Sequence, residues 1–117
     1  MPRYVILQHE TTGGRHFDFM LEMGSVLKTW SLAQSPATGV EIDAEVLGDH
    51  RLAYLDYEGP ISGDRGSVTR WDRGTFEVEY QSETELAVRL SGEKLIGRVS
   101  LRRSPVAENS RRFCFVQ

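Results

Sequence analysis

Two histidines and one aspartate near the N-terminus give the first chemical signal in the sequence. His9, His16 and Asp18 flank a Thr-Thr-Gly-Gly turn, and residues 16–23 alternate between polar and apolar side chains as a strand does. His16 and Asp18 therefore share one strand face, and a tight turn returns the chain so that His9 lies beside them. Two imidazoles and a carboxylate suit Mn, Fe, Co or Zn, with positions left for water or a phosphate oxygen. The alternative is a surface hairpin with solvated histidines.

A second pair of polar rings follows later in the chain, where His50 precedes Tyr54 by four residues. The two side chains share a face whether this stretch is helical or extended, because both periodicities accommodate that spacing. An imidazole and a phenol side by side can donate hydrogen bonds to phosphate oxygens, and an imidazolium can protonate a leaving group. The alternative is an ordinary core tyrosine with its hydroxyl at the rim.

The elements that must position these groups are strands, because apolar side chains alternate with period two almost everywhere and helix-period stretches are scarce. We predict up to nine short strands separated by glycine-bearing turns. Their ranges are 4–8, 16–23, 26–32, 41–47, 67–72, 75–80, 85–90, 95–102 and 111–116. Many short strands indicate a sandwich or a barrel, and closure removes exposed sheet edges. We predict an all-β fold, a small closed or nearly closed β-barrel with little helix.

Length and composition fit one domain over residues 1–117. With 117 residues, of which 39% are hydrophobic, the chain can bury a core without a disulfide or a structural metal. The single Cys114 excludes an internal disulfide and a cysteine zinc site, and it fits a reducing, cytoplasmic compartment. No apolar run approaches the roughly 20 residues of a membrane span, so we expect no membrane contact.

The charges are unevenly distributed along the chain. A net charge of -3 argues against non-specific coating of DNA. From residue 89 onward, however, seven basic residues stand against two acidic ones. This basic end is either a positive wall beside a phosphate site or the solvated face of a strand.

Five blocks in the same order resemble the 3'-phosphoesterase domain of bacterial DNA ligase D. Several collinear blocks are far more specific than any one motif, so we expect a standalone, divergent member of that family. The blocks are His9, His16-Phe17-Asp18-Phe19-Met20-Leu21-Glu22, Leu27-Lys28-Thr29-Trp30, Asp49-His50-Arg51-Leu52-Ala53-Tyr54-Leu55-Asp56-Tyr57-Glu58-Gly59 and Trp71-Asp72-Arg73-Gly74-Thr75.

The resemblance implies a small β-barrel hydrolase that processes nucleic-acid ends in DNA repair. Family members use a manganese-type ion to remove a 3'-terminal ribonucleoside and then the remaining 3'-phosphate, which leaves a 3'-hydroxyl. By position, His9, His16 and Asp18 would hold the metal, with Zn or Co as alternatives to Mn. His50 and Tyr54 would act catalytically on the scissile phosphate. The implied partners are DNA or DNA/RNA 3' ends and the ligase and polymerase of end joining, in a bacterial or archaeal cytoplasm, with the protein a monomer.

Departures from the family pattern bear on activity. Met20 stands where the family has an arginine, which removes a guanidinium expected to clamp phosphate, and Gln34 replaces a second cation. Loss of one charged, preorganised donor costs about 2–4 kcal/mol of transition-state stabilisation. Arg15 is a candidate replacement, and Lys28 and Arg73 are further candidates for substrate contacts, each also explained as an ordinary surface charge. The alternative function is a weakened or inactive relative that binds nucleic-acid ends or a repair partner.

A third interpretation is a mononuclear iron oxygenase. His16, Asp18 and His50 would then form its facial triad of two histidines and one carboxylate. Nothing in the sequence indicates the cosubstrate pocket that such an enzyme needs.

Overall fold

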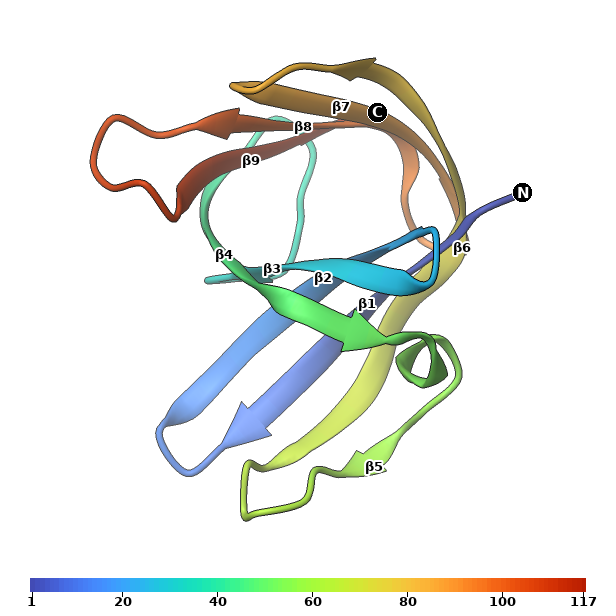
Figure 1. Ribbon diagram of the computed structural model, residues 1–117, viewed down its shortest axis with the longest axis vertical. Helices are drawn as coiled ribbons and strands as arrows, with labels where there is room; N and C mark the ends of the chain where they lie inside the picture. The colour runs from blue at the N-terminus through green and yellow to red at the C-terminus, as the bar shows by residue number, and fades with distance from the viewer.

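Nine antiparallel strands and one short 3-10 helix form the computed structural model, which covers all 117 residues (Figure 1). The strands run in the order β1-β2-β3-β4-β9-β8-β7-β6, and β6 pairs with β1 as well, so the sheet closes on itself. This closure confirms the predicted all-β barrel with little helix. The elements are β1 Arg3–Thr11, β2 Gly14–Met23, β3 Val26–Leu32, β4 Glu41–Arg51, η1 Leu52–Leu55, β5 Gly59–Pro60, β6 Ser67–Gln81, β7 Glu85–Gly92, β8 Ile96–Arg103 and β9 Ser110–Val116.

The strand predictions differ from the structure in two places. The predicted strands 67–72 and 75–80 form one long strand, β6, which runs from one end of the molecule to the other (Figure 1). Gly74 is therefore not a turn residue: a Cβ at this position would overlap the backbone of Ser91, so glycine permits the close approach of β6 to β7. The strand β5 was not predicted, because its two residues are too few to show alternation.

Sixteen buried side chains from the inner strand faces fill the barrel. The Phe19 and Phe113 rings meet edge to face at its centre, with centroids 5.4 Å apart. Large aromatic side chains bury much apolar area when the sheet closes. The interior is therefore a packed apolar core.

The outer faces of β1 and β2 are buried as well, under a second and smaller apolar cluster. Val5, Leu7 and Met20 point away from the barrel interior and are at most 1% exposed. Leu55 of η1 covers them, together with neighbouring side chains of the connection between β4 and β6. We call this connection, residues 52–66, the cover segment. The one helical element, η1, has four residues and is far too short to span a bilayer.

Polar contacts hold the cover segment against the barrel. Asp56 forms an ion pair with Arg3 of β1 at 2.7 Å. Glu58 accepts a hydrogen bond from the backbone N–H of Arg70 in β6 at 2.7 Å, and the Tyr57 hydroxyl donates to the carbonyl oxygen of Pro60. Two acidic residues of the cover segment, Asp56 and Glu58, therefore hold it in place beside the candidate site.

Candidate functional site

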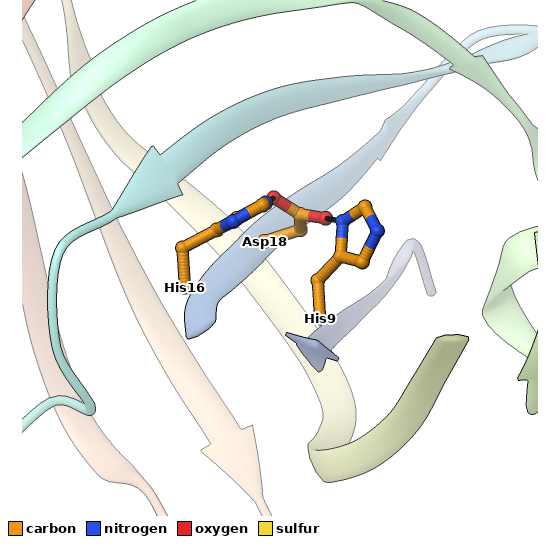
Figure 2. Close-up of side chains that lie close together, drawn as sticks. All are labelled: His9, His16 and Asp18. Atoms are coloured by element: carbon orange, nitrogen blue, oxygen red, sulfur yellow. Dashed lines mark ion pairs between the residues drawn. The ribbon is translucent and has the colours of Figure 1, made fainter. Parts of the chain in front are cut away.

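His9 and His16 are direct neighbours across the β1–β2 hairpin. A two-residue turn, Thr12–Gly13, joins the strands, and the register places His9 opposite His16. Asp18 lies two residues further along β2, so it projects on the same face as His16 and diagonally across from His9. Figure 2 shows the two imidazoles on either side of the carboxylate. The predicted convergence of the three side chains is therefore present, although on the outer face of the sheet and not in its interior.

Distances within this group are those of shared coordination. His9 Nδ1 lies 3.3 Å from Asp18 Oδ2, and His16 Nε2 lies 3.0 Å from Asp18 Oδ1 (Figure 2). One donor atom from each residue lies within 4.8 Å of the others. The Asp18 side chain is 5% exposed, whereas His9 and His16 are 17% and 31% exposed. The carboxylate thus lies at the bottom of the group, and the imidazoles form its entrance.

The hydrogen bonds in this group support cation binding. Asp18 Oδ1 is buried and makes no hydrogen bond of acceptable geometry, despite its nearby imidazole nitrogen. His9 Nε2 lies 2.6 Å from the carbonyl oxygen of Arg65, which can only accept, so Nε2 donates and Nδ1 is the nitrogen that faces Asp18. Nδ1 and the carboxylate oxygen can share either a proton or a metal ion. Metal bonds of about 2.0–2.2 Å leave neighbouring ligand atoms about 3 Å apart, so the three side chains fit a divalent ion.

The electrostatic environment of His16 also favours a cation. Its contact with Asp18 raises the pKa of His16 above the ordinary value, and burial opposes this shift. The negative charge of Glu45 on β4 adds to the increase. The site therefore favours a positive charge at this position, and metal binding competes with protonation of His16.

A small pocket joins two of the three donors to the second predicted pair, whereas His16 lies beside it and does not line it. His9, Asp18, His50 and Tyr54 all line it. His50 lies near the end of β4 and Tyr54 in η1, and their rings meet edge-on with centroids 5.7 Å apart. His50 Nδ1 lies 2.9 Å from the Gly48 carbonyl oxygen and must donate to it. In the neutral ring Nε2 is then the free acceptor, and in the protonated ring it is an acid.

Arg65 is a pocket residue that the sequence analysis missed. It lines the pocket together with Met20, and its guanidinium donates to the carbonyl and hydroxyl oxygens of Ser62 at 2.8 and 3.3 Å. It forms no ion pair with a carboxylate. Gly66 permits this arrangement: its φ is +88°, and a Cβ there would overlap the backbone of Glu10. Only the pairing of β6 with β1 reveals this proximity, and no local sequence signal predicts that pairing.

The three residues that the sequence analysis proposed as substrate contacts lie outside this pocket. The Arg15 guanidinium packs over the Phe17 ring at 5.8 Å, on the strand face opposite His16. Lys28 pairs with Asp49 at 3.2 Å, and Arg73 pairs with Glu93 at 3.2 Å. Roles for Arg15, Lys28 and Arg73 in binding substrate therefore stay predictions.

Two further expectations can be compared with the structure. His50 is not among the donor atoms that converge, so the facial triad of an iron oxygenase is not formed. The basic residues of β7–β9 lie across the barrel from β1 and β2, because β9 and β8 are the farthest strands in the closed order. They pair with carboxylates of their own neighbourhood: Arg89 and Arg98 with Glu79, Arg102 with Glu41, and Arg112 with Asp43. They form no positive wall beside the pocket.

Comparison with known proteins gives this geometry a family context. The family model described as the DNA Ligase D 3'-phosphoesterase domain matches residues 7–103. The multifunctional non-homologous end joining protein LigD of Pseudomonas aeruginosa is 34% identical over 112 residues, covering 87% of this chain and 13% of the relative. Two relatives are 32% identical over 110 residues, covering 86% of this chain and 14% of each relative: LigD of Mycobacterium bovis and the end joining DNA repair protein LigD of Mycobacterium tuberculosis. The chain thus spans about one seventh of the length of these relatives.

Proposed function

Because this chain belongs to the DNA ligase D 3'-phosphoesterase domain family, we propose that it is a metal-dependent phosphoesterase that processes the 3' ends of DNA or DNA/RNA strands. The observation that carries the proposal is the single pocket that joins two groups of side chains. One group is the three converging donors, of which His9 and Asp18 line the pocket, and the other is the His50–Tyr54 pair. A metal site and a phosphate-binding pair at one pocket are the minimum that such a reaction requires.

His9, His16 and Asp18 would hold the ion, for which Mn is the first choice and Zn or Co are alternatives. When bound, the ion supplies positive charge beside the phosphate oxygens. The hydrogen bond from His9 Nε2 to the Arg65 carbonyl keeps Nδ1 directed at Asp18, as outer contacts of ligand histidines commonly do.

His50 and Tyr54 would act on the phosphate from the other side of the pocket. A protonated His50 donates from Nε2 to the departing oxygen, because Nδ1 is already committed to the Gly48 carbonyl. The Tyr54 hydroxyl donates to a non-bridging phosphate oxygen and helps to fix its position. Water supplies the oxygen that bonds to phosphorus, the phosphorus–oxygen bond to the leaving group breaks, and the leaving oxygen departs as a hydroxyl.

Arg65 would bind the phosphate in place of the family arginine, whose position is occupied here by the uncharged Met20. Arg65 lines the pocket and has no carboxylate partner, so its guanidinium, which donates to Ser62 in the structure, would turn toward a bound phosphate and donate to it. The proposed product is a 3'-hydroxyl end, which a polymerase or a ligase can use.

The direct test is incubation with a primer–template that ends in a 3'-ribonucleotide or a 3'-phosphate, with and without Mn. We expect trimming that depends on the metal and is lost in Asp18→Asn, which keeps the side-chain size but removes the charge. The Asp43→Asn variant is a matched control, because Asp43 is an exposed aspartate that pairs with Arg112 on the far side. Intact ends under every metal would contradict the proposal.

A binding protein without turnover is the second candidate. Met20 favours it, because a thioether packed among apolar side chains replaces a charge at the pocket wall. Tight binding of 3' ends with no hydrolysis under any metal would select this function.

A further inference from the structure

A second pocket lies directly beside the first one. Its volume is about 250 Å³, and it opens between η1 and β5, which are close together in the lower part of Figure 1. Tyr54 and Ile61 line both pockets, so they form the wall between them. A molecule whose phosphate occupies the first pocket therefore extends naturally over Tyr54 into the second.

Three aromatic rings lead from one pocket to the other. The His50 and Tyr54 rings meet edge-on, and the next contact, between Tyr54 and Tyr57, has centroids 5.8 Å apart and planes at 89°. The Tyr57 hydroxyl bonds to the Pro60 carbonyl, which fixes the ring at both ends while 37% of the residue stays exposed. Gly59 accommodates this ring, since a Cβ there would lie 3.2 Å from the Tyr57 hydroxyl. Tyr57 thus presents a rigid, accessible aromatic surface.

The second pocket is lined by one positively charged side chain that has no carboxylate partner. Arg51 lines it and takes part in no ion pair. Its other lining groups are the apolar Ile61 and Pro60 and the hydroxyl of Ser62. An aromatic face, a guanidinium and a hydroxyl beside a phosphate site are the groups that bind a nucleoside through stacking and polar contacts.

We propose that this pocket, centred on Tyr57 and Arg51, binds the terminal nucleoside that carries the scissile phosphate. The proposal rests on the proposed function, and it identifies the part of the substrate that contributes binding contacts beyond those of the phosphate. The base stacks on the Tyr57 ring, and Arg51 contributes a cation beside it. The volume is below the roughly 300–1,000 Å³ of pockets for drug-sized ligands, which suits one nucleoside and not a longer strand.

The test uses a primer–template whose 3'-phosphate is carried by a 2-aminopurine nucleotide, since only one nucleoside is then attached to the scissile phosphate. A matched primer carries the 3'-phosphate on an abasic nucleotide. With Mn present, fluorescence is recorded within the first turnover, and KM is then measured on both ends. We expect 2-aminopurine to be quenched on binding, and the quenching to disappear in Tyr57→Leu.

The kinetic expectation is selective. Tyr57→Leu raises KM for the base-bearing end about tenfold and leaves KM for the abasic end unchanged, because stacking on one aromatic ring is lost. Arg51→Gln keeps the Tyr57–Pro60 bond and raises KM for the base-bearing end about three- to tenfold, which covers the case in which Tyr57→Leu fails to fold. Tyr80→Leu is the matched control, because Tyr80 is an exposed tyrosine of β6 outside both pockets.

The outcomes separate this proposal from the proposed function. Quenching without hydrolysis supports the nucleoside pocket and overturns the hydrolytic activity. Hydrolysis of both ends with equal KM in the wild type, or variants that affect both ends alike, overturns the pocket and leaves the activity standing. An absence of both binding and hydrolysis overturns both.

Discussion

At the level of single residues, Met20 determines where a positive charge can enter the pocket. Its side chain is 1% exposed and packs with Val5, Leu7 and Leu27, all of them apolar and fully buried. A flexible thioether suits such a gap, whereas a guanidinium there would lose its water without a carboxylate of its own. The basic residue that lines the same pocket is Arg65, which is exposed and has no carboxylate partner.

We therefore predict that Arg65→Gln lowers kcat/KM on a 3'-phosphate primer by about a hundredfold to a thousandfold, equivalent to about 2–4 kcal/mol. The backbone carbonyl that holds His9 stays in place, so Mn binding changes little. Steady-state kinetics with Mn measure the effect, and Arg15→Gln provides a control of the same chemistry outside the pocket. Equal losses in the two variants would show that Arg65 has no special role.

Tyr4 links stability to alkaline pH. Burial, followed by its 2.6 Å hydrogen bond to Asp72, raises the pKa of Tyr4 far above the ordinary value of 10. The folded state keeps the phenol neutral while the unfolded chain ionises above pH 10, so stability is complete below that pH and falls above it. We predict a loss of about 1.4 kcal/mol of unfolding free energy per pH unit above about pH 10.

Urea unfolding between pH 8 and 11 measures this dependence. Tyr4→Phe should be less stable at pH 8, because Asp72 loses a donor, and its curve should lack this component of the alkaline slope. Identical slopes in the two proteins would contradict the assignment to Tyr4.

At the level of elements, local patterns predict the hairpin that carries the donors. Alternation along 16–23 and the glycine-rich turn together fix the register of His9 against His16, because both signals lie within a few residues. The same reasoning failed at Gly74, where a glycine usually marks a turn and here permits close strand contact. Sequence alone cannot distinguish these two uses, since the deciding neighbour, Ser91, is remote in the chain.

The parts of the pocket that depend on distant pairing were not predictable. Arg65 reaches His9 because β6 returns to pair with β1 and closes the ring. That contact joins residues 56 positions apart, and hydrophobic alternation carries no information about which strands become neighbours. The outer position of the donors follows from alternation along β2, because Phe17, Phe19 and Leu21 on the other face fill the barrel, whereas the cover over the outer face comes from distant residues.

Gly92 tests how closely β7 packs on the Tyr4–Asp72 pair. A Cβ at this position would overlap the Tyr4 hydroxyl and lie 2.7 Å from Asp72 Oδ2. We predict that Gly92→Ala costs about 1–3 kcal/mol of unfolding free energy through overpacking. Gly48→Ala is the control, because nothing lies within 4 Å of a Cβ there, and chemical denaturation of both variants measures the difference. A Gly92→Ala protein as stable as Gly48→Ala would contradict this packing.

At the level of the whole molecule, closure of the β-barrel depends on its last strand. β9 lies between β4 and β8 and contributes Phe113 and Phe115, which are 0% and 4% exposed. The family match ends at residue 103, before this strand begins. Closure of the barrel therefore rests on a segment outside the matched region.

We predict that a chain ending at Arg103 does not unfold cooperatively, because both neighbouring strands become open edges and the core meets water. Near-ultraviolet circular dichroism and thermal unfolding measure the loss. A chain lacking only the exposed Gln117 should unfold like the intact protein. Cooperative unfolding of the longer truncation would show that the other strands can close without β9.

The donors project from the convex side of β1 and β2, whereas the side chains that fill the barrel project from the concave side of the same strands. Successive residues alternate between these sides, so a change in one leaves the other largely untouched. Substitutions around the donors can thus accumulate without rebuilding the scaffold. For the same reason, protein engineers can enlarge or rigidify the interior while retaining the donor group, or transplant that group onto another hairpin of equal register.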